Sequence, residues 1–245
     1  MQIDITFSSG DASRKVDLPI DYNYLVQGFI YHGISEELAA FLHDKGFEFE
    51  KRSFKMFTFS RLLGNCLVQN SRINFEGNIY LHVRSPVVRF VEELANSVLK
   101  SGEVVLGPHK LKVVGVNFPE APKFGSEEQI RLLSAATVYS TLYTGEGRKK
   151  TYYYSPYEAE FSELVTKNAK KKHAILHDKN IGARLTVVPL HMHEIHARYQ
   201  TTVVKGWLGT AILQGSKALI QTVYDTGLGS KNPQGFGMFD VVRNE

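Results

Sequence analysis

Residues 226–237 read Thr-Gly-Leu-Gly-Ser-Lys-Asn-Pro-Gln-Gly-Phe-Gly, and the rest of the chain is arranged around this stretch. Its four glycines form two Gly-x-Gly pairs with five residues between them. Glycine adopts positive φ without steric cost and lets another backbone come close. Backbone amides in such turns form concave anion sites, and Lys231 adds a cation. The stretch therefore indicates a phosphate-binding loop, although a turn-rich connection would have a similar composition.

The flanking patterns exclude two common phosphate-binding motifs. A helical pattern (residues 216–225) precedes the loop, and a strand pattern (residues 236–242) follows it. A dinucleotide fingerprint needs the opposite order, in which a strand leads into the glycine loop and a helix follows. A P-loop needs Gly-Lys-Ser or Gly-Lys-Thr, which this chain lacks. The loop therefore belongs to neither motif.

The composition is that of an ordinary globular protein. The 245 residues are 43% hydrophobic, enough for one large domain or two of about 120 residues. The net charge of +4 and the pI of about 9.0 are compatible with a nucleic-acid partner. The lone cysteine, Cys66, indicates a reducing cytosol, so we expect a cytoplasmic protein. We expect no membrane partner, because residues 1–7 alternate like a strand and no apolar run reaches membrane-spanning length.

Hydrophobic periodicity in the first half predicts the element order β-α-β-β-α-β, which is the ferredoxin-like or RRM-like unit. The predicted strands are residues 2–8, 54–62, 67–75, 78–84, 103–107 and 110–118, with a hairpin turn at Glu76-Gly77. The predicted helices are residues 22–33, capped by Asp21 or Asn23, a second helix between Ser35 and Gly46, and a third from Pro86 to Lys100.

A stretch with two prolines, residues 117–122, separates this half from a second one with a similar order of elements. The second half has predicted strands at residues 131–141, 151–154, 184–190, 195–202, 203–213 and 236–242, and predicted helices at 156–176 and 216–225. We therefore expect an α+β fold of two tandem ferredoxin-like (RRM-like, βαββαβ) domains, residues 1–120 and 121–245. The glycine loop lies in the second domain.

Three residues of the first half could together cut RNA: Tyr31, His43 and Lys55. RNA carries its own nucleophile, the 2′-hydroxyl beside the scissile phosphate, so a metal-free ribonuclease needs groups that move protons and offset charge. A histidine can move a proton near neutral pH, a tyrosine can position or accept one, and a lysine supplies positive charge. The alternative is structural, with Tyr31 as a half-packed aromatic, His43 as a helix cap and Lys55 as a solvated strand end.

Three blocks that contain these residues are similar to the CRISPR repeat-RNA processing endoribonucleases, the sixth Cas family of the RAMP superfamily. The blocks are Leu25–Tyr31, Phe41–Gly46 and Phe54–Ser60, and the glycine loop resembles the family's C-terminal loop through Gln234–Met238. In some members the tyrosine, histidine and lysine of these blocks form the active site, which implies Tyr31, His43 and Lys55 in this chain. His32, next to Tyr31, competes with His43 for the role of the histidine.

The resemblance implies an endoribonuclease that cleaves CRISPR repeat RNA into mature guide RNAs without a metal or another cofactor. The products would carry 5′-hydroxyl and 2′,3′-cyclic phosphate ends. His43 would be the general acid or base, Tyr31 would position or activate the 2′-oxygen, and Lys55 would offset charge. The glycine loop would hold the RNA backbone through Gly227, Gly229, Lys231, Gly235, Phe236 and Gly237. Association with CRISPR effector-complex proteins and formation of a homodimer stay open.

Three further clusters have both a chemical and a structural interpretation. The histidines at 191, 193 and 196 are spaced like metal ligands, but on one strand they point to both faces, which favours an exposed polar edge strand. Residues 148–150 (Arg-Lys-Lys) beside the tyrosines at 152–154 and 157 could contact phosphates and stack on bases, or form an aromatic strand after a soluble turn. The run Lys170-Lys171-Lys172-His173 predicts a solvated helix end that could also contact RNA.

Two other functions fit the same sequence. One is a RAMP-type subunit that holds guide RNA without cutting it, and His43 is the feature against it. The other is a small-nucleotide-binding enzyme with the glycine loop on a mononucleotide. Arg52, Arg61 and Arg72 are close in sequence to the catalytic candidates and could contact phosphates.

Overall fold

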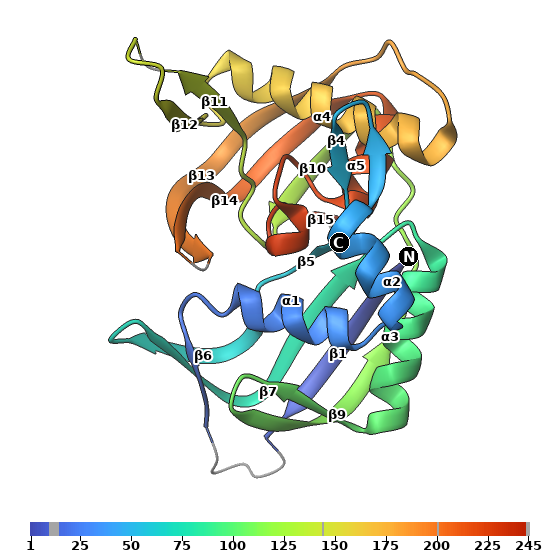
Figure 1. Cartoon of the computed structure of the whole chain (residues 1–245), viewed down its shortest axis with the longest axis vertical. Coiled ribbons are helices and arrows are strands. Elements are labelled where there is room, and N and C mark those ends of the chain that lie inside the picture. Colours follow the sequence, from blue (N-terminus) through green and yellow to red (C-terminus); the bar gives the residue numbers. More distant parts are fainter. Residues whose placement is uncertain (10–14, 144, 200, 244–245) are drawn as a thin grey trace.

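The computed structural model describes residues 1–9, 15–143, 145–199 and 201–243, which form two antiparallel sheets with helices packed on them (Figure 1). The chain passes from the first sheet to the second between Asn117, the end of β9, and Glu127, the start of β10. Each sheet has its own hydrophobic core, and the two clusters share no residue. On this basis we propose that residues 1–120 and 121–245 are separate domains.

The first sheet has the strand order β2-β7-β1-β9-β8, with β5 and β6 also paired to β7. Its strands are β1 (Gln2–Ser8), β2 (Val16–Pro19), β5 (Thr58–Phe59), β6 (Leu63–Gln69), β7 (Arg72–Arg84), β8 (Glu103–Leu106) and β9 (His109–Asn117). The helices of this half are α1 (Asn23–His32), α2 (Glu36–Ala40), a π-helix that continues α2 (Phe41–Lys45), and α3 (Val88–Ser101). A separate hairpin consists of β3 (Phe47–Phe49) and β4 (Arg52–Phe54).

The second sheet has the order β13-β14-β10-β15. Its first strand in the chain, β10, lies inside the sheet, as β1 does in the first sheet. Its strands are β10 (Glu127–Leu132), β13 (Leu185–Tyr199), β14 (Thr202–Gly215) and β15 (Phe239–Val241). The helices are α4 (Ala159–His177), α5 (Lys217–Thr226) and a 3-10 turn in the glycine loop (Asn232–Gln234). A small hairpin of β11 (Tyr139–Tyr143) and β12 (Lys149–Tyr153) follows β10 in the chain and projects beside one end of α4 (Figure 1). The predicted class, two tandem ferredoxin-like units, is confirmed.

Several predicted boundaries are wrong because strands contain irregularities that periodicity does not show. The first hairpin turns at Asn70 and Ser71, whose φ angles are 50° and 60°, rather than at Glu76-Gly77. Gly77, with φ of 75°, instead lies inside β7, close to where the register with β6 shifts. A positive φ at Met56 (56°) divides the predicted strand 54–62 into β4 and β5.

Two more corrections concern the second half. The predicted strand 131–141 is two strands, β10 and β11, with a loop between them. The predicted strands 184–190 and 195–202 are instead the single strand β13, which has a bulge between Pro189 and His191. Proline is tolerated there because β13 is an edge strand and does not need every ladder hydrogen bond. Among the described helices, none is long and apolar enough to cross a membrane.

One fully buried arginine joins the two halves. Arg84, the last residue of β7, donates hydrogen bonds of 3.0 Å to the backbone oxygens of Tyr224 on α5 and Phe239 on β15. It also contacts the Asp240 carboxylate at 3.0 Å, and its guanidinium lies 3.5 Å from the centre of the Tyr224 ring. On its own side of the junction, its Nε donates to Gln2 at 2.8 Å. The relative position of the two halves therefore depends on the hydrogen bonds of the buried Arg84 guanidinium as well as on apolar packing.

Candidate functional site

Two of the three catalytic candidates are joined by a hydrogen bond. The Lys55 ammonium donates to the backbone oxygen of His43 at 2.9 Å. Gly46, with φ of 67°, ends the π-helix, and the β3–β4 hairpin then brings the chain back to His43. The His43 side chain is 80% exposed, and its Nδ1 lies 2.7 Å from the Asp44 carboxylate. Because Asp44 engages Nδ1, Nε2 is the ring nitrogen that can exchange a proton with a bound molecule.

Tyr31, the third catalytic candidate, is connected to the cavity through Phe57 and, among the described residues, forms no hydrogen bond with His43 or Lys55. Its ring packs edge to face against Phe57, with the centroids 5.9 Å apart, and Phe57 lines the same cavity as Lys55. Burial, together with the neighbouring Tyr199, raises the pKa of Tyr31 to about 12. The phenol therefore keeps its proton at neutral pH and acts as a hydrogen-bond donor. Partial burial lowers the pKa of Lys55, and the Asp44 carboxylate opposes this shift.

The competing histidine is engaged by its own helix. His32 is the last residue of α1, and its Nδ1 donates to the backbone oxygen of Gly28 at 2.6 Å. This contact orients the ring along α1, whereas the ring of His43 is held by a carboxylate. The two histidines therefore differ in their partners: the His32 ring is bound to a backbone oxygen, and the His43 ring to a carboxylate.

The glycine loop, residues 227–237, is held against α1 of the first half. Asn23 donates to the backbone oxygen of Gln234 at 2.9 Å, and Gln27 donates to that of Pro233 at 2.6 Å. The predicted capping role of Asn23 is wrong: Tyr22 is the N-cap residue, without a side-chain cap, and the Asn23 amide binds the loop instead. Because α1 carries Tyr31 near its other end, the loop has a fixed position relative to the catalytic candidates.

A buried lysine of α4 holds the loop from the inside. Lys172 is 2% exposed, and its ammonium donates to the backbone oxygens of Gly227 (2.8 Å) and Gly229 (3.3 Å) and to Oδ1 of Asn232 (2.7 Å). These three acceptors match the three donors of an ammonium group. Asn232 in turn donates to the backbone oxygens of Leu228 and Phe236. The predicted solvated helix end at 170–172 is therefore wrong for Lys172, because the glycine loop covers this side chain and binds its ammonium.

Replacing Lys172 by methionine is expected to lower the free energy of unfolding by about 2 kcal/mol, because buried carbonyl oxygens lose their donor. Burial lowers the pKa of Lys172 to about 7, below the value near 10.4 of an unfolded chain. The unfolded state then binds more protons between these values, so Lys172 makes the wild type more stable as pH rises from 7 to 10. The deficit of Lys172→Met should widen over that range in chemical denaturation. Equal loss in Lys170→Met, on the same helix, would contradict the assignment.

The loop glycines are required by packing inside the protein. A Cβ at Gly235, where φ is 84°, would lie 2.6 Å from the Phe59 ring and 2.7 Å from the Asn23 amide. Phe236 is 1% exposed and belongs to the second core, so its side chain packs inside the protein rather than facing a ligand. The RNA contacts predicted for this loop therefore depend on its outer residues, above all on Lys231, whose ammonium lies 5.3 Å from the centre of the Tyr139 ring.

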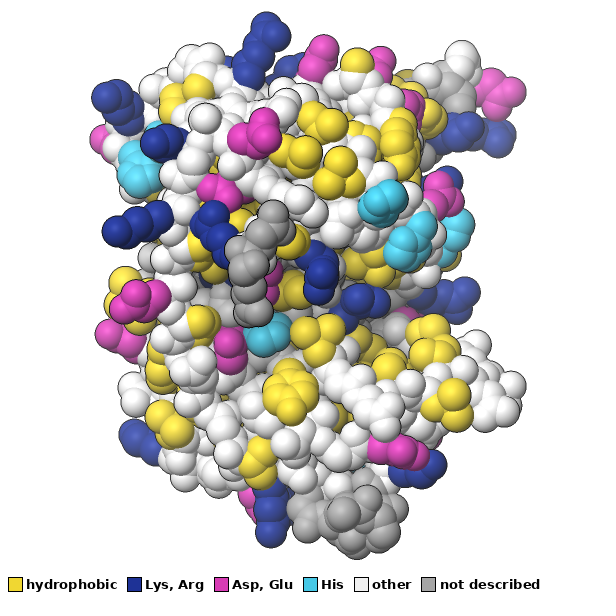
Figure 2. Space-filling model, turned by 180° about the vertical axis from the view of Figure 1, so that it is seen from behind, with side chains coloured by type: hydrophobic (Ala, Val, Ile, Leu, Met, Phe, Trp, Pro, Cys, Tyr) yellow, Lys and Arg dark blue, Asp and Glu magenta, His cyan; other side chains and the backbone are white. Residues whose placement is uncertain are grey.

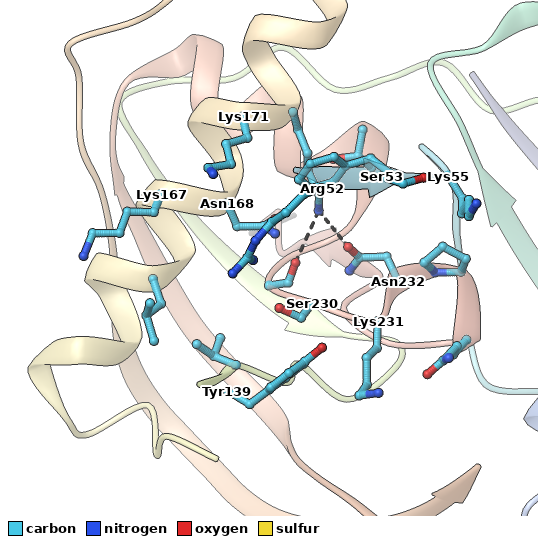
Figure 3. Close-up of a pocket in the computed structure, with 18 of the residues that line it drawn as sticks. Arg52, Ser53, Lys55, Tyr139, Lys167, Asn168, Lys171, Ser230, Lys231 and Asn232 are labelled. Atoms are coloured by element: carbon cyan, nitrogen blue, oxygen red, sulfur yellow. Dashed lines mark hydrogen bonds between the residues drawn. The ribbon is translucent and has the colours of Figure 1, made fainter. Parts of the chain in front are cut away.

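A cavity of about 760 Å³ lies between the two halves, beside Lys55 (Figure 3). Its walls come from the β3–β4 hairpin and the segment after it, from α4, from β11 and from the glycine loop. The cationic residues that line it are Arg52, Lys55, Lys167, Lys171, Lys172 and Lys231. Among the lining residues that the structure describes, none is acidic. Such a surface attracts anions, and the spacing of cations from several elements suits a polyanion.

Lys167 of α4 is a cavity residue that sequence reasoning missed, whereas Lys171 belongs to the lysine run that the sequence already marks as able to contact RNA. Lys167 and Lys171 are four residues apart, so they lie on one face of the helix, and this spacing was the available signal. Lys171 is 2.8 Å from the Glu50 carboxylate, and Lys167 is 4.0 Å from that of Glu163. Both ion pairs involve exposed carboxylates, which a polyanion can displace at little cost.

The three arginines singled out in the sequence have different places. Arg52 lines the cavity and points into it (Figure 3). Arg61 instead donates to the backbone oxygen of Leu133. Arg72 is 2.6 Å from the Asp17 carboxylate on the neighbouring strand β2. Only the first of them is therefore placed to contact an anion in the cavity.

The histidines at 191, 193 and 196 lie on the edge strand β13, as the sequence favoured. Figure 2 shows histidines gathered at this edge of the molecule, and Lys and Arg side chains across the middle, where the two halves meet. Glu194 pairs with His196 and with Lys205, both at 3.1 Å. In the part of the chain that the structure describes, no group of three or more His, Cys, Asp or Glu side chains is placed to hold a metal ion.

Two tandem ferredoxin-like units with a glycine loop and a cationic cavity between them define a class of nucleic-acid-binding α+β protein. Comparison with known families places the chain within that class. Residues 17–117 match the family described as CRISPR-associated protein Cas6, N-terminal, and residues 118–241 match CRISPR associated protein Cas6, C-terminal. The chain belongs to the Cas6 family.

Individual relatives cover nearly the whole chain. The CRISPR-associated endoribonuclease Cas6 1 of Methanocaldococcus jannaschii is 27% identical over 242 residues, which cover 93% of this chain and 89% of that protein. The CRISPR-associated endoribonuclease Cas6 of Pyrococcus furiosus is 23% identical over 96% of this chain and 88% of its own length. A solved structure described as an RAMP protein binding different RNA substrates has the same fold, with a TM-score of 0.83, 20% identity, and coverage of 99% and 100% of the two chains.

Proposed function

We propose that this chain is an endoribonuclease that cleaves CRISPR repeat RNA within the repeat, without a metal ion. The 2′-hydroxyl attacks the adjacent phosphorus and the bond to the 5′-oxygen breaks, which leaves a 2′,3′-cyclic phosphate and a 5′-hydroxyl. The observation that carries the proposal is the 2.9 Å hydrogen bond from the Lys55 ammonium to the backbone oxygen of His43, which joins the segment that carries the histidine to a lysine of the cationic cavity. Family membership and the names of both relatives support endoribonuclease activity on this RNA.

Each residue has a role that its surroundings support. His43, held through Nδ1 by Asp44, transfers the proton through Nε2, either from the 2′-oxygen or to the leaving 5′-oxygen. Tyr31, whose phenol is protonated at neutral pH, donates a hydrogen bond that positions the reacting oxygen. Lys55 offsets the charge that develops on the phosphorane. Lys231 and the outer face of the glycine loop hold the backbone of the RNA beside these groups.

The reaction is expected to proceed at the full rate in excess EDTA, because the RNA supplies the nucleophile and the protein supplies the proton transfer. A single 2′-deoxy substitution at the cleaved linkage should abolish cleavage and leave binding unchanged. Both are measured with end-labelled repeat RNA on a denaturing gel, and mass spectrometry of the products identifies the cyclic phosphate. Activity that EDTA removes and magnesium restores would overturn the mechanism.

The cationic cavity also supports a second function, in which the protein holds guide RNA without cutting it, since a row of cations binds RNA whether or not His43 acts. Incubation of the purified protein with its own repeat RNA separates the two functions. Tight binding without a product would favour the binding subunit. Competition by excess ATP would instead indicate a mononucleotide site at the glycine loop.

A further inference from the structure

The β11–β12 hairpin forms part of the cavity wall, and its far end extends beyond the cavity. Tyr139, Ser140 and Thr141 of β11 form part of the cavity wall. Lys231 of the glycine loop lies over the Tyr139 ring, so the face of the hairpin that carries Tyr139 looks toward the loop. The hairpin is therefore one of the walls along which a bound chain could leave the cavity.

Strand alternation extends this face to the tip of the hairpin. Side chains two residues apart share a face, so Tyr139, Thr141 and Tyr143 point the same way. Directly opposite pairs also share a face, and the regular register pairs Tyr143 with Lys149. Tyr143 is 67% exposed, and Lys149 is exposed as well. Thr141 is the last residue of β11 that lines the cavity, and two further residues of extended strand cover about 7 Å, so the exposed pair lies just beyond the cavity wall.

The other face of the hairpin has a different environment. It carries Tyr152 and Lys150, whose register partners are Ser140 and Leu142. The Tyr152 hydroxyl donates to the Glu158 carboxylate at 2.7 Å, and its ring contacts that of Tyr154. A tyrosine and a lysine thus occur on each face, and both faces reach the cavity wall, through Tyr139 and Thr141 on one and Ser140 on the other. The face of Tyr143 is the one over which Lys231 lies, whereas Tyr152 on the other face is bound to Glu158.

We propose that single-stranded RNA next to the cleavage site leaves the cavity along the face of this hairpin that carries Tyr139, where Tyr143 stacks on a base and Lys149 contacts a phosphate. An exposed tyrosine beside a lysine is the usual pairing for single-stranded nucleic acid, because every base has a face for stacking and every linkage a charge. This inference rests on the proposed function and adds a path for the RNA outside the catalytic centre. It also selects Tyr143, rather than the tyrosines at 152–154, as the residue that stacks.

The test compares two double variants of the full chain, Tyr143→Ala with Lys149→Ala and Tyr152→Ala with Lys150→Ala. The probe is the repeat RNA of the host's own CRISPR array, and binding is measured by fluorescence anisotropy at several salt concentrations. We expect the Tyr143/Lys149 variant to raise the Kd about 5–150-fold, the usual effect of one lost stacking contact. Loss of one phosphate contact should reduce the log-log salt slope by about one unit. The Tyr152/Lys150 variant should stay within twofold of the wild type.

A set of repeat RNAs shortened from each end locates the contact. Removing the nucleotides that reach the hairpin should weaken binding to the wild type and have no effect on the Tyr143/Lys149 variant, since the contact is already absent. Equal affinities for wild type and both variants, or equal losses in both, would overturn the inference. Cleavage of the repeat by the wild type is measured in parallel. If the wild type does not cut, the proposed function fails; if it cuts and the variants bind equally, only the path along the hairpin fails.

Discussion

Replacing His43 by alanine is expected to lower the rate of repeat-RNA cleavage by about 10²–10⁴-fold, the usual loss when a general acid or base is removed. Binding should change little, because the imidazole is exposed beside the cavity and is not among the cationic residues that line it. The Lys55 hydrogen bond goes to the backbone oxygen of residue 43, which alanine retains. Single-turnover cleavage and equilibrium binding, measured separately, therefore distinguish a proton-transfer residue from a structural one.

His32→Ala is the matched control for this experiment. His32 is also exposed and lies at the end of a neighbouring helix, but its Nδ1 is bound to its own α1 backbone. We expect His32→Ala to cut repeat RNA at close to the wild-type rate. An inactive His32→Ala beside an active His43→Ala would transfer the role to His32 and keep the reaction class. Normal cleavage by both variants would reject the histidine mechanism.

Replacing Arg84 by methionine is expected to lower the free energy of unfolding by about 3–5 kcal/mol, as when one partner of a buried polar contact is removed. Methionine fills much of the space but leaves the backbone oxygens of Tyr224 and Phe239 without their donor. For a chain of this size the loss corresponds to a fall in the unfolding midpoint of roughly 6–20 °C. Circular dichroism during heating or denaturant titration measures it. Because Arg84 joins the two halves, repeat-RNA cleavage should also fall at temperatures where the variant is still folded.

Arg72→Met is the control, since Arg72 is the first residue of the same strand, β7, and is paired with Asp17 at the surface. Exposed ion pairs contribute about 1 kcal/mol or less, so this variant should unfold close to the wild type. Similar losses in both variants would show that the buried contacts of Arg84 have no special importance for the junction between the halves.

The sequence determined the fold class and most elements because the signals are local. Apolar residues recur at helical spacing in α1, α3 and α5, and Gly102 ends α3 in the left-handed conformation that a glycine allows. The pattern also placed Lys55 and His43 in the two segments that the structure joins. Strand ends were less accurate, because a positive φ at Met56 ends a strand without changing the apolar pattern, and Glu76-Gly77, which look like a turn, lie within β7.

The tertiary structure alone decided which charged residues face a ligand. Lys170, Lys171 and Lys172 are adjacent and look equivalent in sequence, and both Lys171 and Lys172 line the cavity. The Lys171 side chain is partly exposed and pairs with Glu50, whereas the Lys172 ammonium is buried and bound to the glycine loop. Arg84 and Arg72 end the same strand, but only Arg84 meets the second half of the chain. Local spacing fixes the face of a helix or strand on which a side chain lies. What covers that face comes from residues more than 50 positions away, and their contacts, not the pattern, decide whether a charge is buried, paired or open to RNA.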